Sequence, residues 1–278
     1  MSNATDTKRY LFSQLLAVAV LLAAGSSLGA EDASPGPLTN AHAHNDYDHP
    51  RPLLDALDHG FCSVEADVFL INGELLVGHD EDELSPQRTL KKLYLDPLQE
   101  RVEQRGEIYP KHGPPLTLLV DIKSDGASTF AALHELFTEY SDMLSVVVDD
   151  QLERKAVSVV ISGNRPEKEI AASNPRYVGI DGRLSDLERD TPGHLMPLVS
   201  DNWFRHFQWR GRGTMPEAEQ KRLREIVTQA HEQGRRVRFW ATPEDPKLWK
   251  ELLEAGVDLI GTDDLGGLQE YLSSRSAE

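Results

Sequence analysis

Two short motifs in the chain place ionisable side chains two residues apart in apolar surroundings. Glu65 and Asp67 lie inside the apolar run 62–70, and Asp121 and Lys123 end a second apolar run. Residues two apart on a β-strand share one face, so each pair points to the same side. Buried carboxylates are costly unless they are paired or bind a metal. The three carboxylates therefore predict a cation site, with pairing to basic loop side chains as the alternative interpretation.

The cation expected at Glu65, Asp67 and Asp121 is one divalent ion that prefers oxygen ligands, Mg²⁺ or Ca²⁺. A divalent cation neutralises two of the three carboxylate charges, and the ammonium of Lys123 balances the third. A phosphodiester anion can then bind between two positive partners, the cation and Lys123. The residues therefore indicate chemistry on a phosphodiester.

Two histidines stand where they could complete this chemistry. His44 follows the apolar segment 39–43, and His79 follows a short apolar run that ends at Gly78. Displacement at phosphorus needs one group to activate the attacking oxygen and another to protonate the leaving oxygen. Histidine can do both near neutral pH. We therefore expect His44 and His79 to be the acid–base pair, with a purely structural role as the alternative.

A scaffold has to bring these residues together, and eight apolar runs alternate with amphipathic stretches along the chain. This alternation predicts an α/β fold of β-α-β units, and eight units predict a closed (β/α)₈ barrel with its active residues at the C-terminal strand ends. An open doubly wound sheet is the alternative, although no glycine-rich phosphate loop follows the first run. The expected strands are Thr39–Ala43, Cys62–Leu70, Leu116–Ile122, Ala156–Ile161, Tyr177–Ile180, Met196–Val199, Val237–Trp240 and Leu259–Thr262. The expected helices are Arg51–Asp58, Thr89–Gln104, Ser128–Tyr140, Glu167–Ala172, Pro216–Gln233, Pro246–Glu254 and Gly267–Ser274.

Three local features add to this outline. Gly73 is expected in a tight turn, and the segments 145–148 and 155–160 are expected to pair as a small hairpin. An aromatic cluster follows the sixth strand and can either pack between barrel helices or form an apolar lip for a lipid tail. Its members are Trp203, Phe204, Phe207 and Trp209.

The first thirty residues have the order of a secretory signal peptide. Lys8 and Arg9 precede an apolar run from Tyr10 to Ala24, and small residues follow it. We expect residues 1–30 to be a signal peptide, residues 31–38 a linker and residues 39–278 the barrel. The mature protein is then exported, periplasmic or secreted, without a stable membrane span; an uncleaved N-terminal membrane anchor is the alternative.

The chain is strongly acidic, with a formal net charge of −17 at pH 7. Such a surface repels nucleic acid and anionic lipid headgroups, so no nucleic-acid partner is expected. A small-molecule or lipid-derived phosphodiester remains a suitable substrate because a bound cation can reverse the local field. Cys62 is the only cysteine, so no intrachain disulfide is possible, and we interpret it as a core residue.

Seven residues together resemble the pattern of the glycerophosphodiester phosphodiesterase superfamily of phospholipase C-like barrels. They are His44, Glu65, Asp67, His79, Asp121, Lys123 and Trp240. The segments 44–47 and 93–98 are most similar to the branch named after the altered inheritance of mitochondria protein 6. The resemblance covers roughly residues 39–272 and is specific only as a combination. It implies a TIM barrel of the phospholipase C-like phosphodiesterase type.

The resemblance also implies residue roles. It makes His44 and His79 the acid–base pair and places Lys123 on the phosphate. The carboxylates at 65, 67 and 121 become the metal ligands, and Trp240 lines the substrate pocket.

The chain departs from the family pattern beside the first histidine. Asn45-Asp46 stands where the family has Arg-Gly, so Asn45 takes the place of a phosphate-binding arginine. The third ligand is Asp121, as in sphingomyelinase D, rather than glutamate. Arg165 ends the fourth strand and is a further candidate for the phosphate, with a salt bridge to a loop carboxylate as the alternative.

Two other functions stay open from the residues alone. His42 and His44 match the His-x-His metal ligands of amidohydrolase barrels, but the ends of the expected fifth and sixth strands offer no histidine. The second alternative is a non-catalytic binding barrel, because a fold does not establish activity.

Overall fold

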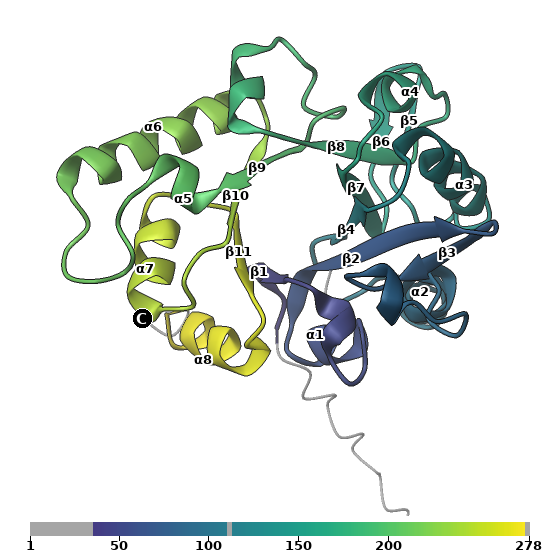
Figure 1. Ribbon diagram of the computed structural model, residues 1–278, viewed down its shortest axis with the longest axis horizontal. Helices are drawn as coiled ribbons and strands as arrows, with labels where there is room; N and C mark the ends of the chain where they lie inside the picture. Colours follow the sequence, from purple (N-terminus) through teal and green to yellow (C-terminus); the bar gives the residue numbers. More distant parts are fainter. Residues whose placement is uncertain (1–35, 110–112, 276–278) are drawn as a thin grey trace, which may run out of the picture. The chain divides into compact units, whose positions relative to one another are not determined.

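The computed structural model of the protein describes residues 36–109 and 113–275. Eight parallel strands follow one another around a ring that closes between the first and the last (Figure 1). The pairing of β1 with both β2 and β11 closes the barrel and confirms the expected (β/α)₈ fold. The barrel strands are β1 (Leu38–Ala43), β2 (Phe61–Ile71), β4 (Leu116–Ile122), β7 (Val157–Gly163), β8 (Val178–Gly182), β9 (Leu198–Asn202), β10 (Arg236–Trp240) and β11 (Leu259–Thr262).

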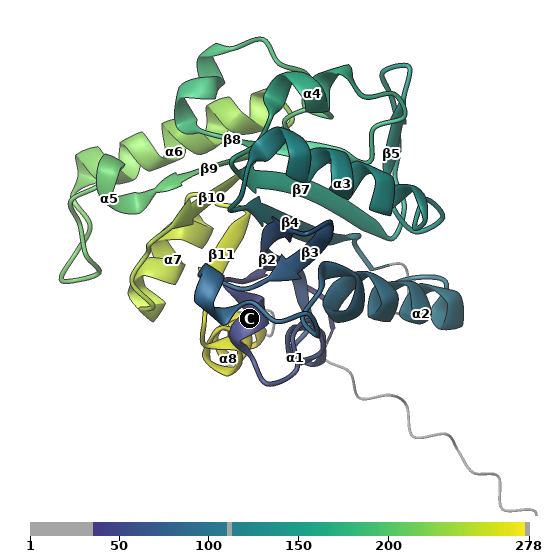
Figure 2. The ribbon, with the colours of Figure 1, turned by 45° about the vertical axis from the view of Figure 1, so that its right-hand side comes forward.

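Helices follow most strands and pack on the outside of the ring, as Figures 1 and 2 both show. The α2 helix is preceded by a π-helical turn at Lys91–Leu95. The helices are α1 (Leu54–Asp58), α2 (Asp96–Arg105), α3 (Gly126–Thr138), α4 (Glu167–Ala172), α5 (Trp203–His206), α6 (Glu217–Glu232), α7 (Pro246–Glu254) and α8 (Leu265–Arg275).

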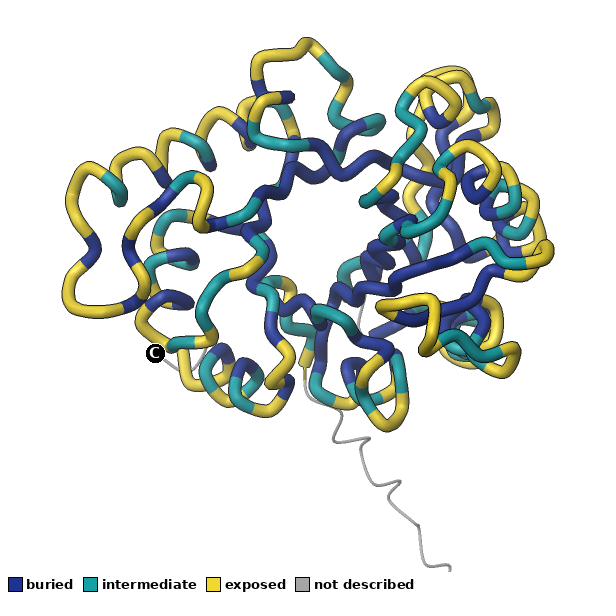
Figure 3. Tube along the Cα trace, in the orientation of Figure 1, coloured by how far each residue is buried: buried dark blue, intermediate teal, exposed yellow. Residues whose placement is uncertain are grey.

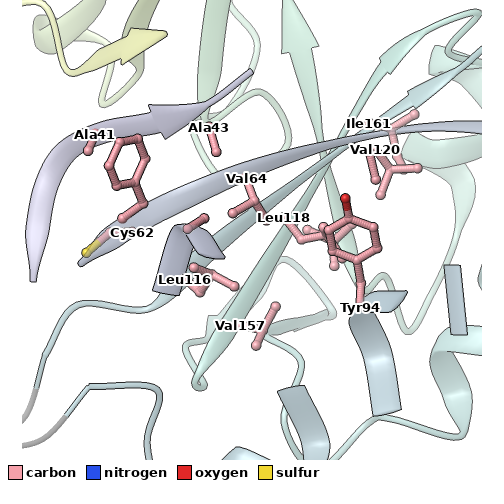
Figure 4. Packing of buried hydrophobic residues seen from close by; sticks show 14 of the residues in the cluster. Ala41, Ala43, Cys62, Val64, Tyr94, Leu116, Leu118, Val120, Val157 and Ile161 are labelled. Atoms are coloured by element: carbon pink, nitrogen blue, oxygen red, sulfur yellow. The ribbon is translucent and has the colours of Figure 1, made fainter. Parts of the chain in front are cut away.

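Two apolar clusters stabilise the barrel, one outside the ring of strands and one inside it. The outer cluster uses the strand residues that point away from the axis, and Figure 4 shows Val64, Leu118 and Ile161 among them. Cys62 belongs to this cluster, and burial raises the pKa of its thiol to about 12. The thiol is therefore an inert core group, as expected. The inner cluster consists of Leu119, Val160, Leu198 and Leu259.

Strand register fixes which side chains point into the barrel. Leu119 lies opposite both Glu65 on β2 and Val160 on β7. Asp67 and Asp121 lie opposite one another two residues further along, toward the C-terminal ends of β2 and β4. The interior therefore has an apolar middle and an acidic mouth, and Figure 3 shows the strands of the ring as mostly buried.

The turn after β2 forms as expected. Asn72 and Gly73 both have positive φ and connect β2 to the antiparallel strand β3 (Glu74–Val77). Two such residues form the type I′ turn that matches the twist of a hairpin. This turn directs β3 back toward the barrel mouth, where the next residues carry His79.

The expected pairing of residues 145–148 with 155–160 is wrong. The strand β5 (Val146–Val148) instead pairs with β6 (Gln151–Glu153). Asp149 and Asp150 form the turn, both with positive φ, and the Asn174 side chain donates to Asp149 at 2.7 Å. Asp is among the residues that tolerate this conformation, so a hairpin shorter than the expected one can close.

The N-terminal prediction falls mainly on residues that the structure does not describe. The expected signal peptide, residues 1–30, and linker residues 31–35 lie outside the described ranges. Among residues 36–109 and 113–275, no helix has the length and apolar character needed to cross a bilayer.

Candidate active site

Three carboxylates meet at the C-terminal ends of β2 and β4. Glu65, Asp67 and Asp121 each offer an oxygen, and these oxygens lie within 4.8 Å of one another. Asp67 is 1% exposed and Glu65 is 6% exposed. The structure therefore brings together the three residues that were expected to bind a metal.

Glu65 contacts two buried basic side chains inside the barrel. Its Oε2 accepts from Nη2 of Arg238 at 2.6 Å and lies 3.0 Å from Nε2 of His42. Burial by itself would raise the pKa of Glu65, but the charge of Arg238 and the hydrogen bond with His42 outweigh it and lower the pKa. Glu65 is therefore held as a carboxylate.

His42 is a fully buried structural residue. Its Nδ1 lies 2.7 Å from Oγ of Ser63, while its Nε2 faces Glu65. Burial, followed by the charge of Arg238, lowers the pKa of His42 to about 3. Both ring nitrogens are engaged, so His42 has none available for the metal of an amidohydrolase-type site.

Asp67 uses one oxygen for protein contacts and leaves the other without a partner. Its Oδ2 accepts from the hydroxyl of Tyr47 at 2.8 Å and from Nζ of Lys123 at 3.0 Å. Its Oδ1 is buried and has no hydrogen-bond partner among the described residues. Burial raises the pKa of Asp67 despite the charge of Lys123. A buried acceptor without a donor is rare in a folded protein and needs a partner.

Asp121 lies beside the same lysine, with its Oδ1 3.3 Å from Nζ of Lys123. Burial is the main cause that raises the pKa of Asp121 to about 6, and the charges of Asp67 and Glu65 add to it. Gly163, at the end of β7, has φ +68° and leaves room for this carboxylate. A Cβ at position 163 would come within 2.3 Å of Asp121 Oδ1.

These contacts fit the binding of a divalent cation. Protein donors within the described residues engage one oxygen each, namely Oε2 of Glu65, Oδ2 of Asp67 and Oδ1 of Asp121. Burial is the main cause of the raised pKa of Asp121, and the neighbouring carboxylates Asp67 and Glu65 raise it further. A hard cation would balance the charge of these carboxylates and supply the missing partner of Asp67.

His44 stands directly after β1, and its ring is oriented by two acidic residues of the loops after β10 and β11. Its Nδ1 lies 2.8 Å from Oδ1 of Asp263. Oε1 of Glu244 in turn accepts from the backbone N–H of Asp263 and from the hydroxyl of Thr262. When Nδ1 donates to Asp263, the neutral ring carries no proton on Nε2. His44 can therefore present Nε2 as a base.

His79, two residues beyond β3, has a similar arrangement. Its Nδ1 lies 3.2 Å from Oδ2 of Asp67 and 3.3 Å from the Tyr47 hydroxyl. The Tyr47 proton goes to Asp67, so Nδ1 of His79 can donate to the same carboxylate. The Nε2 atom then remains for chemistry. Each expected catalytic histidine therefore has a carboxylate at Nδ1.

The substrate-binding residues expected from the sequence have different surroundings. Trp240 lines a cavity of about 160 Å³ together with His44 and Arg238. Asn45 has a left-handed conformation, with φ 45° and ψ 43°. Arg165 lies 3.6 Å from Glu167 and forms the salt bridge that was the alternative to a phosphate contact. The structure therefore places Trp240 beside His44 and pairs Arg165 with a neighbouring carboxylate.

A further polar network at the C-terminal ends of β7, β8 and β9 was not expected. Asp181 is fully buried, and its Oδ2 accepts from the hydroxyls of Ser162 and Ser200. It also lies 3.0 Å from Nη1 of Arg183. This anchor holds a partly exposed guanidinium at the strand ends where the other site residues collect.

Two residues of the site were missed, and the sequence contained a signal for one of them. Arg238 lies two residues before Trp240 and therefore shares its inward face. A charged residue on that face of a buried strand indicates a buried ionic partner. The contact of Tyr47 with Asp67, by contrast, depends on the loop that follows His44 and has no periodic signal.

The aromatic cluster after β9 packs into the protein. The rings of Trp203 and Phe207 stack at 4.1 Å, and both meet Phe239 edge-on. Trp203, Phe207 and Trp209 are buried, whereas Phe204 is 42% exposed. This arrangement agrees with packing rather than with an apolar lip.

Comparison with known families identifies similarity over most of the barrel. A model described as the AIM6-like phosphodiesterase domain matches residues 34–181. A model of the glycerophosphoryl diester phosphodiesterase family matches residues 236–266. The two matches cover the strand ends that carry the carboxylates and Trp240.

Curated relatives agree with these matches. Altered inheritance of mitochondria protein 6 of Eremothecium gossypii is 33% identical over 84% of this chain and 69% of its own length. A homologue from Arthroderma benhamiae is 28% identical over 83% of this chain and 82% of its own length. Among solved structures, a glycerophosphodiester phosphodiesterase from Parabacteroides distasonis matches with a TM-score of 0.54. That match has 18% sequence identity and covers 87% of this chain and 100% of the other, which supports a common fold.

Proposed function

Because the chain belongs to the AIM6-like phosphodiesterase family, we propose that it is a metal-dependent phosphoric diester hydrolase. Its substrate is a small or lipid-derived phosphodiester. One Mg²⁺ or Ca²⁺ binds to Glu65, Asp67 and Asp121. His44 and His79 are the acid–base pair.

The observation that carries the proposal is the pairing of both histidines with carboxylates beside the acidic cluster. Asp263 faces Nδ1 of His44, and Asp67 faces Nδ1 of His79. A carboxylate in this position orients the imidazole and stabilises its protonated form. The distal nitrogens are then available for proton transfer.

Each side chain of the site has a separate role in the proposed reaction. One histidine takes a proton from the attacking oxygen, and the other gives a proton to the leaving oxygen as its bond to phosphorus breaks. The ammonium of Lys123 binds a phosphate oxygen. The carboxylates of Asp67 and Asp121 hold this ammonium at the acidic cluster. A divalent cation at this site supplies Lewis-acid stabilisation of the phosphate charge. The attacking oxygen is water or a neighbouring hydroxyl of the substrate.

Recognition of the rest of the substrate uses the mouth of the barrel. Trp240 offers a flat apolar surface next to His44, and Asn45 offers a neutral amide. Arg183 adds a cation on the Asp181 side of the mouth. Arg165 attracts the substrate anion from a distance without contacting it, because its side chain pairs with Glu167.

The test is phosphorus NMR of the purified chain with glycerophosphocholine and lysophosphatidylcholine, each with Mg²⁺, Ca²⁺ or a chelator. New phosphorus signals that disappear with the chelator are expected, and their shifts distinguish a cyclic product from a hydrolysed one. Asp121→Asn should weaken cation binding at least tenfold by calorimetry while circular dichroism stays unchanged. Tight cation binding without turnover of either substrate would instead favour a non-catalytic binding barrel.

We also propose that the protein is exported after removal of residues 1–30. The charged start at Lys8 and Arg9 and the apolar run 10–24 support this. Mass spectrometry of the protein made in its native host should find an N-terminus near residue 31. A retained Met1 in a membrane fraction would support an N-terminal anchor instead.

A further inference from the structure

A second polar cavity lies at the N-terminal ends of the strands, opposite the acidic mouth. It has a volume of about 560 Å³. Thr117, Ser158 and Arg236, which line it, stand at the starts of β4, β7 and β10. The inner apolar cluster separates the two ends, and its member Val160 also lines this cavity. The cavity is therefore distinct from the candidate active site.

The charge of this cavity is opposite to that of the chain. Its lining contains Arg154, Arg176, Arg236 and His194 but no aspartate or glutamate among the described residues. The whole chain has a net charge of −17. Three arginines around one cavity in such a protein form a local positive site, which is an electrostatic complement to an anion.

Two of these arginines have no carboxylate partner among the described residues: Arg176 is buried and Arg236 is partly buried. Arg176 is 4% exposed, donates to Nδ1 of His194 at 2.8 Å, and has a buried Nε without a partner in the described part of the chain. Arg236 donates to Oγ1 of Thr117 at 3.0 Å. Burial lowers the pKa of both guanidinium groups, and Asp150 and Asp258 only partly offset it from a distance. Buried cations of this kind are costly unless an anion pairs with them.

Arg238 shows what is missing at Arg236. The two arginines lie on the same inward face of β10, two residues apart. Arg238 has Glu65 at 2.6 Å, whereas Arg236 forms no ion pair among the described residues. No carboxylate of the described residues takes the corresponding position at Arg236, so a bound anion would be needed to form an ion pair there.

Apolar side chains line the rest of the cavity. Val147 and Leu152 come from the β5–β6 hairpin, and Val178 and Pro197 come from the barrel wall. Leu152 is 38% exposed at the rim. The cavity therefore offers an apolar surface beside its positive charge, and the hairpin contributes to it.

We propose that this cavity binds a small amphiphilic anion, with a phosphate or carboxylate head group on the arginines and a short apolar tail against the hairpin. Guanidinium groups recognise both head groups through paired hydrogen bonds. The neutral ring of His194 accepts from Arg176 at Nδ1, so its Nε2–H is a further donor. The site is independent of the proposed reaction, because none of its lining residues belongs to the acidic mouth.

Isothermal titration calorimetry of the full chain in the presence of a chelator tests this site. The probes are octyl phosphate and octanoate for the two head groups, with octyl glucoside as the neutral control. At least one anion should bind with a stoichiometry of one, at least tenfold more tightly than octyl glucoside. Equal binding of octyl glucoside, or no binding of either anion, would overturn the proposal. A response to only one anion identifies the head group.

Variants locate the site and guard against misfolding. Arg154→Ala and Leu152→Glu change exposed residues, so they should keep the circular dichroism spectrum but weaken binding at least tenfold. Arg176→Gln should have the larger effect. Arg224→Ala removes an equal charge from the exposed face of α6 and should leave binding unchanged. Unchanged affinity in Arg154→Ala and Leu152→Glu would place the anion elsewhere and refute the assignment.

Discussion

The guanidinium of Arg238 and the carboxylate of Glu65 form an ion pair across the barrel interior, with 2.6 Å between Nη2 and Oε2. Both side chains are almost completely buried. Glu65 is therefore held as a carboxylate in the folded protein. The pair joins β10 to β2, and its two residues are 173 positions apart in the chain.

Breaking this pair should strongly destabilise the protein. Arg238→Met leaves a buried carboxylate without its main cation, which typically costs about 3–5 kcal/mol of the free energy of unfolding. Urea denaturation at pH 7 measures the change. Arg236→Met is the matched control, because Arg236 lies on the same strand face without an ion pair and should cost much less. A loss below about 1 kcal/mol in Arg238→Met would show that the pair is not needed.

The histidines should be necessary for turnover and not for folding. His44→Ala and His79→Ala should each lower kcat by roughly 10²–10⁴, because each removes one proton-transfer group. Initial rates on the substrate identified by phosphorus NMR provide the measurement. His59 is a suitable control histidine, because it caps α1 before the start of β2, at the opposite end of the barrel.

Asp263 should act as a positioning residue for His44. Asp263→Ala removes the acceptor at Nδ1, so kcat should fall by less than in His44→Ala while KM stays similar.

The acid–base assignment itself depends on His44→Ala and His79→Ala. Losses of kcat smaller than about tenfold in both of these variants would contradict it.

Burial of Asp46 should make stability depend on pH. Its Oδ2 accepts from Leu53 N–H and the Tyr94 hydroxyl, but burial still raises its pKa to about 7. The folded state therefore binds a proton more tightly than the unfolded state, whose carboxyl has a pKa of about 3.9. The stabilising contribution is present at low pH and is lost as pH rises from about 4 through 7, at roughly 1 kcal/mol per pH unit.

Asp46→Asn isolates this contribution, since an amide oxygen can accept the same two hydrogen bonds without ionising. The free energy of unfolding of the variant relative to the native chain should rise between pH 5 and pH 7. Urea denaturation across this range measures it, with Asp125→Asn as the control, because hydrogen bonds from Ser128 lower the pKa of Asp125. A difference between Asp46→Asn and the native chain that does not change with pH would contradict the assignment.

The sequence predicted the barrel and the acidic cluster because both depend on strand periodicity. Glu65, Asp67 and Asp121 occupy alternate positions of apolar runs, and the parallel register of β2 with β4 aligns two of them. Seven of the eight strands lie within about two residues of the expected ranges at both ends. Alternation and the ends of strands are local properties, so they can be predicted from a single sequence.

Contacts between distant strands and loops could not be predicted in this way. The partners of His44 and Asp67 come from loops whose conformations depend on the closed barrel. The hairpin around residues 145–160 was placed wrongly because its turn uses two aspartates with positive φ, where a glycine would have been the clearer signal. The alternation along its strand places Arg238 on the inward face. Its partner Glu65, however, lies on a distant strand and can be identified only from the closed barrel.

Gly163 should be essential for the geometry of the cation site. Its φ of +68° disfavours any residue with a side chain, and a Cβ would come within 2.3 Å of Asp121 Oδ1 and 2.4 Å of the Ile122 carbonyl oxygen. The backbone oxygen cannot move freely, so Gly163→Ala should displace the Asp121 carboxylate. Cation affinity, measured by calorimetry, should fall at least tenfold, and stability should fall by roughly 1–3 kcal/mol. Gly106→Ala is the matched control, because Gly106 also has positive φ but no atom within 4 Å of an added Cβ. It should lose stability and keep its cation affinity, so equal affinities in the two variants would show that Asp121 does not need the space at Gly163.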